Sequence, residues 1–293
     1  MRLPRGHDSS SSSLVCRLRK SLYGLRQASR QWYAKLSSAL RSKGYTHSSN
    51  DYSLFLKRMP SSIVIVAIYV DDILVTGNNE DEILNLKSFL DEQFKIKDLG
   101  LIHFFLGIEF NKISDGMVFQ ALHLNNKSDF KMEAFCDSDR AACPLTRRSV
   151  SGFFITLGGS PISCKSKKQV TVSLSSAEAE YRSMRRVTTE LAWLTRLFTD
   201  FQLDNITPIQ LKYDNLAAIY IATNPVFHER TKHIEIDCHN HREKVQDGLI
   251  RLSHVDTLDQ QVDLLTNLFR DIATQKLYPS LVCFNAHQLV GVC

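Results

Sequence analysis

The sequence predicts a mixed α/β (α+β) protein with two folded domains, and three observations support this. Its 293 residues are enough for two domains of ordinary size. A run rich in β-branched residues, broken by two aspartates and then resumed, predicts a buried hairpin in the first half. In the second half the expected elements follow in the order β-β-β-α-β-α-α-β-α, which is typical of a layered sheet.

The first half begins with polar sequence and becomes globular from Leu14. Five consecutive serines end its first 13 residues, so we expect this N-terminus to be disordered. A helix is expected to close at Gly44, because glycine readily adopts the left-handed conformation that ends helices. The expected elements are a helix over Gln31–Lys43, strands over Ile63–Val70 and Ile73–Thr76, a helix over Glu80–Phe94, a strand over His103–Phe110 and irregular polar sequence over Asn111–Ser128.

The second half carries a long helix whose start is marked by a capping box, Ser175-Ser176-Ala177-Glu178. Apolar residues follow from Ala177 at steps of three or four, which predicts one buried stripe. A short helix is expected after Asp214 and another from Asp259. The remaining expected elements are strands at Phe130–Cys136, Gly152–Leu157, Pro161–Cys164, Ile209–Tyr213 and Leu249–Ser253, and a helix near Ile236–Asp247.

Composition excludes several classes of protein. Hydrophobic residues at 43% and charged residues at 23% are close to the globular average, so most of the chain can build a core. The seven cysteines form no C-x-x-C pair, which argues against a disulfide framework and a zinc ribbon. Histidines near Cys238 are therefore expected to be structural. The apolar run Ile63–Val70 is too short to span a bilayer, and we expect an intracellular protein with no membrane partner.

A basic stretch runs from Arg17 to Lys43 without an acidic residue. With Tyr23, Trp32 and Tyr33 interleaved, it could follow a phosphate backbone and stack on bases. A solvated helix face packed through those aromatics is an equally good interpretation. The two alternatives stay open on this pattern alone.

Four acidic residues of the second half are expected at one edge of the sheet, where strands end and helices start. Phosphodiester chemistry commonly uses two divalent ions about 4 Å apart, and Mg²⁺ prefers oxygen ligands. A single carboxylate is more often a plain surface charge, so the hypothesis depends on convergence. The candidates are Asp137, Glu180, Asp214 and Asp263.

The motifs around these residues resemble the ribonuclease H domain of Ty1/copia-type retrotransposons over roughly residues 123–270. The resemblance implies that the four acidic residues bind two Mg²⁺ (or Mn²⁺) ions and cut RNA in an RNA–DNA hybrid. It implies that Glu180 is the metal ligand, while Glu178 caps the helix. Basic residues between the motifs, Lys165, Lys167 and Lys168, are expected to contact nucleic acid. The motifs are Phe135-Cys136-Asp137-Ser138-Asp139, Lys165-Ser166-Lys167-Lys168-Gln169, Ser175-Ser176-Ala177-Glu178-Ala179-Glu180-Tyr181, Lys212-Tyr213-Asp214-Asn215, the run from Asn224 to Ile234, and Val262-Asp263-Leu264-Leu265-Thr266.

The first half resembles the reverse transcriptase of the same elements. The resemblance implies that Asp71 is a polymerase metal ligand with Asp72 beside it, and that residues from Tyr23 to Gln27 shape a template and nucleotide pocket. The expected nucleic-acid contacts are Arg17, Arg19, Lys20, Tyr23, Arg26 and Gln27. The motifs are Lys20-Ser21-Leu22-Tyr23-Gly24-Leu25-Arg26-Gln27-Ala28, Tyr69-Val70-Asp71-Asp72-Ile73-Leu74-Val75-Thr76-Gly77, Lys97-Asp98-Leu99-Gly100 and Phe105-Leu106-Gly107-Ile108-Glu109.

The sequence also departs from these families. Only Asp8 and Asp51 precede Asp71, and neither matches the third palm aspartate, so we expect no DNA synthesis by this chain alone. A thumb and connection segment is missing near Gln120. Several family residues are replaced, which resembles a decaying copy of an element. Arg140 and Cys164 stand where tryptophan is usual, Arg185 and Arg186 where small residues are usual, and Asn267 where lysine is usual.

The expected organisation has a disordered stretch, a truncated reverse transcriptase palm, a linker, a ribonuclease H-like mixed-sheet domain and a tail. The leading hypothesis is a ribonuclease H-type endonuclease whose partner is an RNA–DNA hybrid or template nucleic acid. A non-catalytic nucleic-acid-binding relic and a chain that barely folds are the alternatives. Other retroelement proteins are conceivable partners, and neither the oligomeric state nor the choice of cytoplasm or nucleus follows from the sequence. The segments are 1–13, 14–112, 113–128, 129–270 and 271–293.

Overall fold

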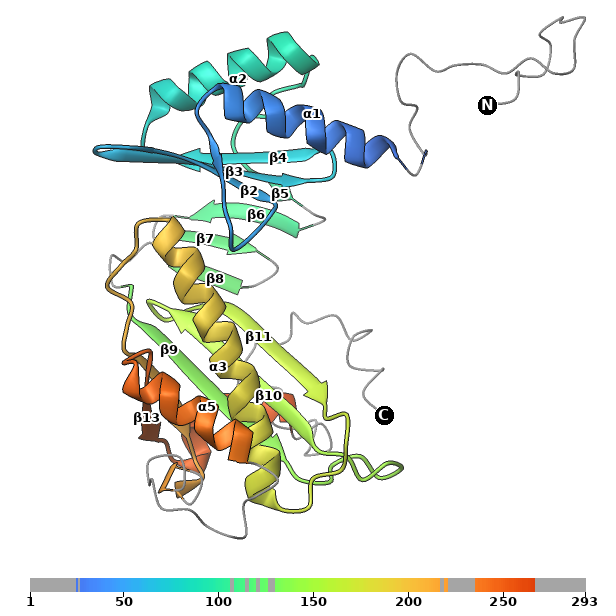
Figure 1. Ribbon diagram of the computed structural model, residues 1–293, viewed down its shortest axis with the longest axis vertical. Coiled ribbons are helices and arrows are strands. Elements are labelled where there is room, and N and C mark those ends of the chain that lie inside the picture. Colours follow the sequence, from blue (N-terminus) through green and yellow to red (C-terminus); the bar gives the residue numbers. More distant parts are fainter. Residues whose placement is uncertain are drawn as a thin grey trace, which may run out of the picture. The chain divides into compact units, whose positions relative to one another are not determined.

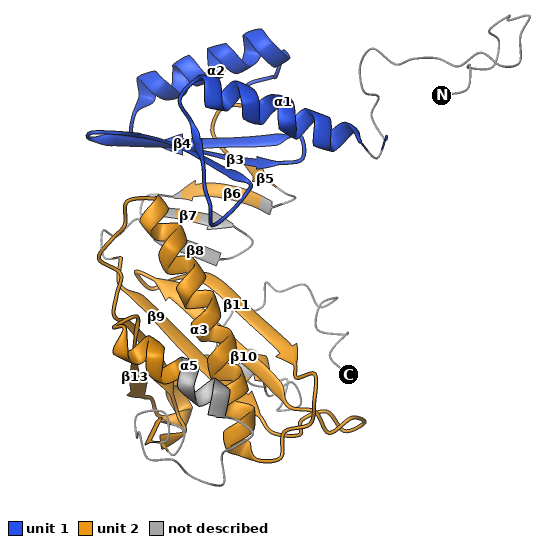
Figure 2. Ribbon diagram, viewed as in Figure 1, with its two compact units in different colours: residues 1–98 blue, residues 99–293 orange. Residues whose placement is uncertain are grey.

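The chain divides into two compact units, residues 1–98 and 99–293, which are described separately (Figure 2). The computed structural model describes residues 25, 27–105, 108–113, 116–119, 122–125, 130–216, 219–220 and 235–266. No helix among these described residues has the length and apolar character needed to cross a membrane.

The first unit is a four-stranded antiparallel sheet, in the order β1-β2-β3-β4, packed against two helices (Figure 1). Side chains of β3 alternate between buried and half-buried, so one face of the sheet forms the core with both helices. The predicted hairpin is confirmed as β3 and β4. The elements are α1 (Ala28–Ser42), β1 (Thr46–His47), β2 (Leu54–Met59), β3 (Ser62–Tyr69), β4 (Asp72–Gly77) and α2 (Glu80–Phe94).

Helix α1 ends at a glycine, as the sequence predicts. Gly44 has φ +84°, and its N–H donates to the carbonyl of Arg41 at 3.0 Å. The next N–H, of Tyr45, donates to the carbonyl of Leu40 at 3.1 Å. This pair of hydrogen bonds is a Schellman motif, and it turns the chain from the helix toward β1.

The second unit is built on a five-stranded sheet in the order β11-β10-β9-β12-β13 (Figure 1). Strand β10 pairs antiparallel with both β9 and β11, whereas β12 runs parallel to both β9 and β13. The predicted mixed sheet is confirmed. The elements are β9 (Met132–Asp139), β10 (Val150–Leu157), β11 (Ser160–Lys168), α3 (Ser176–Asp200), β12 (Ile209–Tyr213), α5 (Glu235–Gln246), β13 (Ile250–His254), the 3₁₀ turn η2 (Thr257–Asp259) and α6 (Asp263–Thr266).

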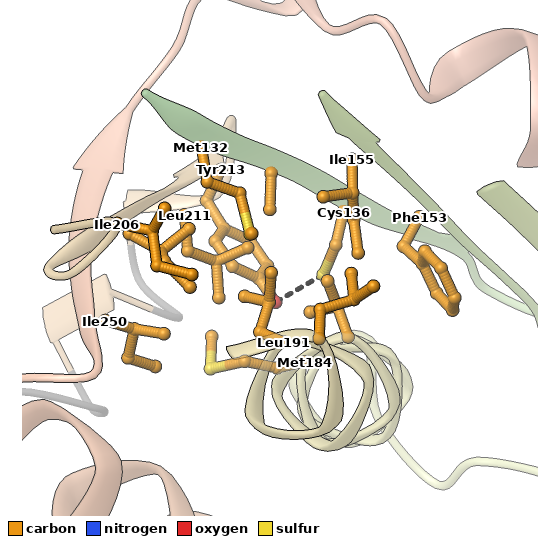
Figure 3. Close-up of a cluster of buried hydrophobic side chains, with 14 of the residues drawn as sticks. Met132, Cys136, Phe153, Ile155, Met184, Leu191, Ile206, Leu211, Tyr213 and Ile250 are labelled. Atoms are coloured by element: carbon orange, nitrogen blue, oxygen red, sulfur yellow. Dashed lines mark hydrogen bonds between the residues drawn. The ribbon is translucent and has the colours of Figure 1, made fainter. Parts of the chain in front are cut away.

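Helix α3 supplies the main core of this unit. Its stripe Tyr181, Met184, Val187 and Leu191 is fully buried against the inner side chains of the sheet (Figure 3). The Ser175 hydroxyl accepts the N–H of Glu178, which confirms the predicted cap. A smaller apolar cluster lies on α6 and the sheet residues facing it, and comprises Phe135, Phe154, Val262 and Leu265 with Cys164 packed against them.

Three expectations about elements are wrong. The strand expected over 103–110 is two strands, β5 (Phe104–Phe105) and β6 (Ile108–Ile113), paired antiparallel. The segment expected to be irregular contains β7 (Gly116–Phe119) and β8 (Leu122–Asn125), which complete a sheet in the order β5-β6-β7-β8. Backbone groups make a strand ladder, so polar side chains do not prevent it. The helix expected from Asp259 starts instead at Asp263, after the 3₁₀ turn η2.

Some sequence predictions concern residues outside the described ranges. They include the serine-rich N-terminus 1–13, the motif run 224–234 and the tail 271–293. Of the short helix expected after Asp214, residues 216, 219 and 220 are described and are helical.

Candidate metal centre

Three of the four predicted acidic residues meet in the second unit. Asp137, Asp214 and Asp263 each offer a carboxylate oxygen, and these oxygens all lie within 4.8 Å of one another. Asp137 is near the end of β9, Asp214 directly follows β12, and Asp263 begins α6. Because β9 and β12 are parallel neighbours, their carboxyl ends reach the same edge of the sheet. The topology therefore brings together residues that are distant in sequence.

Glu180, in the first turns of α3, lies beside this cluster, and its carboxyl interacts electrostatically with all three aspartates. Its side chain is only 6% exposed, and its Oε2 atom has no hydrogen-bond partner among the described residues. Burial and then the charges of Asp137, Asp214 and Asp263 raise the pKa of the Glu180 carboxyl to about 9. An unpartnered buried carboxylate oxygen facing three other acids is an energetically poor arrangement without a cation.

Asp137 is oriented by Thr266, a residue of the last motif to which the sequence analysis gave no role. The Thr266 hydroxyl donates a hydrogen bond to the Oδ2 atom of Asp137 from α6. This bond lowers the pKa of Asp137, but the larger effect of burial leaves that pKa raised overall. The hydrogen bond from Thr266 therefore orients the Asp137 carboxylate within the cluster. A threonine one turn after an acidic residue on a short final helix is a weak signal in sequence alone.

Gly152 on β10 lets α6 approach the sheet. It is the register partner of Asp137, and a Cβ atom built there would lie 2.7 Å from Val262 Cγ1 and 2.8 Å from Thr266 Cγ2. Real side chains do not tolerate such distances, so only glycine fits without displacing the helix. Gly152 thus determines the position of both Thr266 and Asp263.

Glu178, the other acidic residue of the same motif, does not join the cluster. Its carboxylate accepts the N–H of Leu174 at 2.7 Å and forms a 2.6 Å ion pair with Arg182. These contacts fix the turn before α3 and leave Glu180 as the residue that faces the other acids. The three clustered aspartates offer only oxygen donors, which fits a hard divalent cation.

The aspartate pair of the first unit lies at the exposed tip between β3 and β4. Within the described residues, Asp71 and Asp72 belong to no group of three potential metal ligands. Val70, before the pair, has φ +53°, which is costly for a β-branched residue. The Trp32 indole N–H of α1 donates to the Val70 carbonyl at 2.9 Å. This hydrogen bond holds the strained tip in place.

Replacing Trp32 with phenylalanine should loosen this tip. The change removes the hydrogen bond to Val70 while keeping an aromatic ring next to Phe94, whose centroid lies 5.2 Å away. We expect a loss of about 1 kcal/mol in stability and faster amide exchange around Asp71 and Asp72. Hydrogen exchange followed by mass spectrometry measures both effects.

Tyr33→Phe is the matched control, since it removes a hydroxyl on the same helix that donates to the Tyr52 carbonyl. Tip exchange should not change in that variant. Equal exchange at the tip in both variants would show that the indole does not hold the hairpin.

The predicted basic residues are only partly brought together. Lys165 and Lys167 are exposed on β11, whereas the Lys168 amine lies 3.2 Å from the Cys143 sulfur. Gln27 is exposed at the start of α1 and makes no side-chain cap. The remaining predicted contacts, Arg17, Arg19, Lys20, Tyr23 and Arg26, lie outside the described residues.

One of the histidines expected to be structural is described with its side chain. His241 of α5 is fully buried, and its Nδ1 atom lies 3.2 Å from the Thr188 hydroxyl. Burial lowers its pKa to about 4, so the ring is neutral and packed at neutral pH. This is the structural role that the sequence predicts.

Comparisons with known proteins agree with these observations. A family model described as reverse transcriptase (RNA-dependent DNA polymerase) matches residues 1–144. The retrovirus-related Pol polyprotein from transposon RE1 of Arabidopsis thaliana is 30% identical over 355 residues, covering 88% of this chain and 24% of the relative. The corresponding polyprotein from transposon RE2 of the same plant is 29% identical, covering 92% of this chain and 25% of the relative.

Among solved structures, LC11-RNase H1, isolated from compost by a metagenomic approach, is 16% identical with a TM-score of 0.39. That match covers 49% of this chain and 98% of the ribonuclease. The chain spans about a quarter of the length of the curated relatives that it matches. The alignment with RE1 is longer than the chain itself, 355 positions against 293 residues, so the relative contains residues that have no counterpart here.

The reverse transcriptase match and the layered sheet with its clustered carboxylates place the chain in a family of nucleic-acid enzymes. More particularly, it is related over most of its length to the Ty1/copia-type retrotransposon Pol polyproteins. Residues 1–144 match reverse transcriptase sequence, and much of the rest of the chain is related to the same polyproteins.

Proposed function

We propose that the chain is a metal-dependent ribonuclease that hydrolyses the RNA strand of RNA–DNA hybrids, with Asp137, Glu180, Asp214 and Asp263 as its metal ligands. The observation that carries the proposal is the meeting of three carboxylates within 4.8 Å of one another, with the buried Glu180 beside them. The relationship to retrotransposon Pol proteins supports nucleic acid as the substrate.

Two divalent ions, Mg²⁺ or Mn²⁺, would activate the attacking water and neutralise charge on the leaving oxygen. The protein's own part is to hold the ligands at one edge of the sheet. Thr266 fixes one oxygen of Asp137, so that carboxylate enters the site already oriented. Glu180 gives up its proton when a cation is bound, because the cation offsets the burial and like charges that raise its pKa.

Cleavage of a labelled RNA strand in an RNA–DNA hybrid tests the proposal. With Mg²⁺ or Mn²⁺ the chain should cut the RNA, and EDTA should stop the reaction. Asp214→Asn should reduce the rate by at least about 100-fold, because even residues that only support a metal ligand contribute up to that factor. The variant is expected to fold, since Asp214 follows β12 and is half-exposed.

Binding of the hybrid without cleavage, equal in the wild type and Asp214→Asn, would favour the alternative of a non-catalytic nucleic-acid-binding protein. The relevant observation for that alternative is the set of basic side chains along β11 and α3. Circular dichroism of both proteins checks that any loss of activity does not come from unfolding.

A further inference from the structure

A second feature of the ribonuclease H-like unit is a basic groove between the edge strand β11 and helix α3. It has a volume of about 610 Å³. Lys165 and Lys167 border it from the strand, and Arg182, Arg185 and Arg186 border it from the helix. One carboxylate, that of Glu190, is among the lining residues, and it accepts a hydrogen bond from Ser163.

The five basic side chains that border this groove differ in the partners of their positive charges. Arg182 is paired with Glu178 outside the groove at 2.6 Å. Arg186 instead donates to the uncharged Lys167 carbonyl at 3.0 Å, and burial followed by the charge of Arg182 lowers its pKa. The protein therefore holds the half-buried Arg186 guanidinium beside another cation, with the Lys167 carbonyl as its hydrogen-bond acceptor. Such a site favours an incoming anion.

The groove is at the same level of the sheet as the metal centre. Asp137 is the register partner of Gly152, and Gly152 is the register partner of Ser166, which separates Lys165 from Lys167. Two strand spacings of about 4.8 Å place the backbone of Ser166 about 10 Å from that of Asp137.

We propose that this groove binds the phosphodiester backbone of the hybrid whose RNA strand is cut at the metal centre. The inference rests on the proposed function, and it assigns substrate contacts to Arg185 and Arg186, which the sequence motifs do not explain. Guanidinium groups can engage phosphate oxygens in pairs, and lysines add point charges that follow the backbone without reading sequence. Phe153, the aromatic lining residue, is buried, so base stacking is not part of the contact.

Hybrid binding by the full chain in EDTA tests the groove without requiring cleavage. The groove variant K165Q/R185Q removes two exposed charges and leaves the hydrogen-bonded Arg182 and Arg186 intact. The matched control is R196Q/R251Q, which removes two exposed charges outside the groove lining. Fluorescence anisotropy of a labelled RNA–DNA hybrid across a salt series measures Kd and its dependence on salt.

The groove variant should weaken binding by about 10- to 100-fold near 0.1 M salt and lower the slope of log Kd against log salt by about two. In the control R196Q/R251Q, the changes in Kd and in the salt slope should each be less than half of those in the groove variant. Equal effects in both variants, or an unchanged slope in K165Q/R185Q, would overturn the proposal. So would displacement of the hybrid by polyglutamate at equal charge concentration, which would indicate an acidic protein as the ligand.

The groove and the nuclease can fail separately. If the wild type cuts RNA but K165Q/R185Q keeps the full salt slope, the nuclease stands and the groove proposal is wrong. If the wild type cuts nothing but the slope falls in that variant, the groove stands and the proposed function is wrong.

Discussion

Glu180→Gln should remove the loss of stability that the metal-free chain shows between about pH 6.5 and 9. The carboxyl of Glu180 keeps its proton up to a pKa of about 9 in the folded state, whereas its ordinary value is 4.5. Between these values the unfolded chain releases a proton that the folded chain retains. The contribution of Glu180 to the stability of the wild type is therefore fully present below about pH 4.5. It is lost as the pH rises toward 9.

The slope of that loss is about 1.4 kcal/mol per pH unit where the difference is one full proton. Glutamine carries no proton to release and occupies nearly the same volume, so the variant should have a much flatter profile between about pH 6.5 and 9, above the range in which the buried His241 affects stability. Urea unfolding at several pH values, with EDTA present throughout, measures the difference.

Added Mg²⁺ should stabilise the wild type much more than Glu180→Gln. A cation that binds the folded state stabilises it by mass action, and it needs the charged form of Glu180. The wild type should gain stability on addition of Mg²⁺ above neutral pH, and Glu180→Gln should gain little. Glu178→Gln is the matched control, because its side chain caps the turn before α3 and pairs with Arg182 outside the cluster.

A wild-type profile as flat as that of Glu180→Gln would contradict the prediction. The same holds if Glu178→Gln abolishes the Mg²⁺ response while Glu180→Gln keeps it. Either result would mean that the residue facing the other acids has been assigned incorrectly.

Much of the site could be predicted because its ligands follow from local pattern. Asp137 and Asp214 come at or just after the ends of apolar strands, and the capping serine Ser175 fixes where α3 starts. Parallel pairing of β9 and β12 then requires the two strand ends to meet. These steps depend on neighbouring residues and on general sheet rules, so one sequence is enough to argue them.

The supporting contacts could not be predicted in the same way. Thr266 bonds to Asp137 across 129 positions of sequence, and nothing near either residue indicates that contact. The different contacts of Lys165 and Lys168 could not be predicted either, because the two lysines look equivalent in the motif. The alternation of side chains along β11 directs Lys165 to the groove, whereas Lys168 contacts Cys143. Strands β7 and β8 were missed because their ladder depends on backbone pairing.

Gly152→Ala should damage the metal centre without touching any of its ligands. The added methyl group would meet Val262 Cγ1 at 2.7 Å and Thr266 Cγ2 at 2.8 Å, and the Leu265 Cβ atom is 3.3 Å away. These atoms belong to the α6 segment, so the helix must move away from β10. We expect a loss of about 1–3 kcal/mol in the free energy of unfolding, as is usual for overpacking.

The larger consequence is at the site, because α6 carries both Asp263 and Thr266. A displacement of about 1 Å would lengthen the hydrogen bond to Asp137 and separate Asp263 from the other two aspartates. Cleavage should fall by about 100-fold, and the stabilisation by Mg²⁺ should fall with it. Urea unfolding with and without Mg²⁺ separates the packing cost from the metal effect.

Gly248→Ala is the control for the loss of a glycine as such. A Cβ atom there has no neighbour within 4 Å, but the residue has φ +71°, so alanine costs about 1–2 kcal/mol of backbone strain. The two variants therefore have similar stability costs, yet only Gly152→Ala changes the position of α6. If both lose the Mg²⁺ response equally, lower stability explains the loss; if only Gly152→Ala loses it, the close contact between β10 and α6 is what holds the carboxylates together.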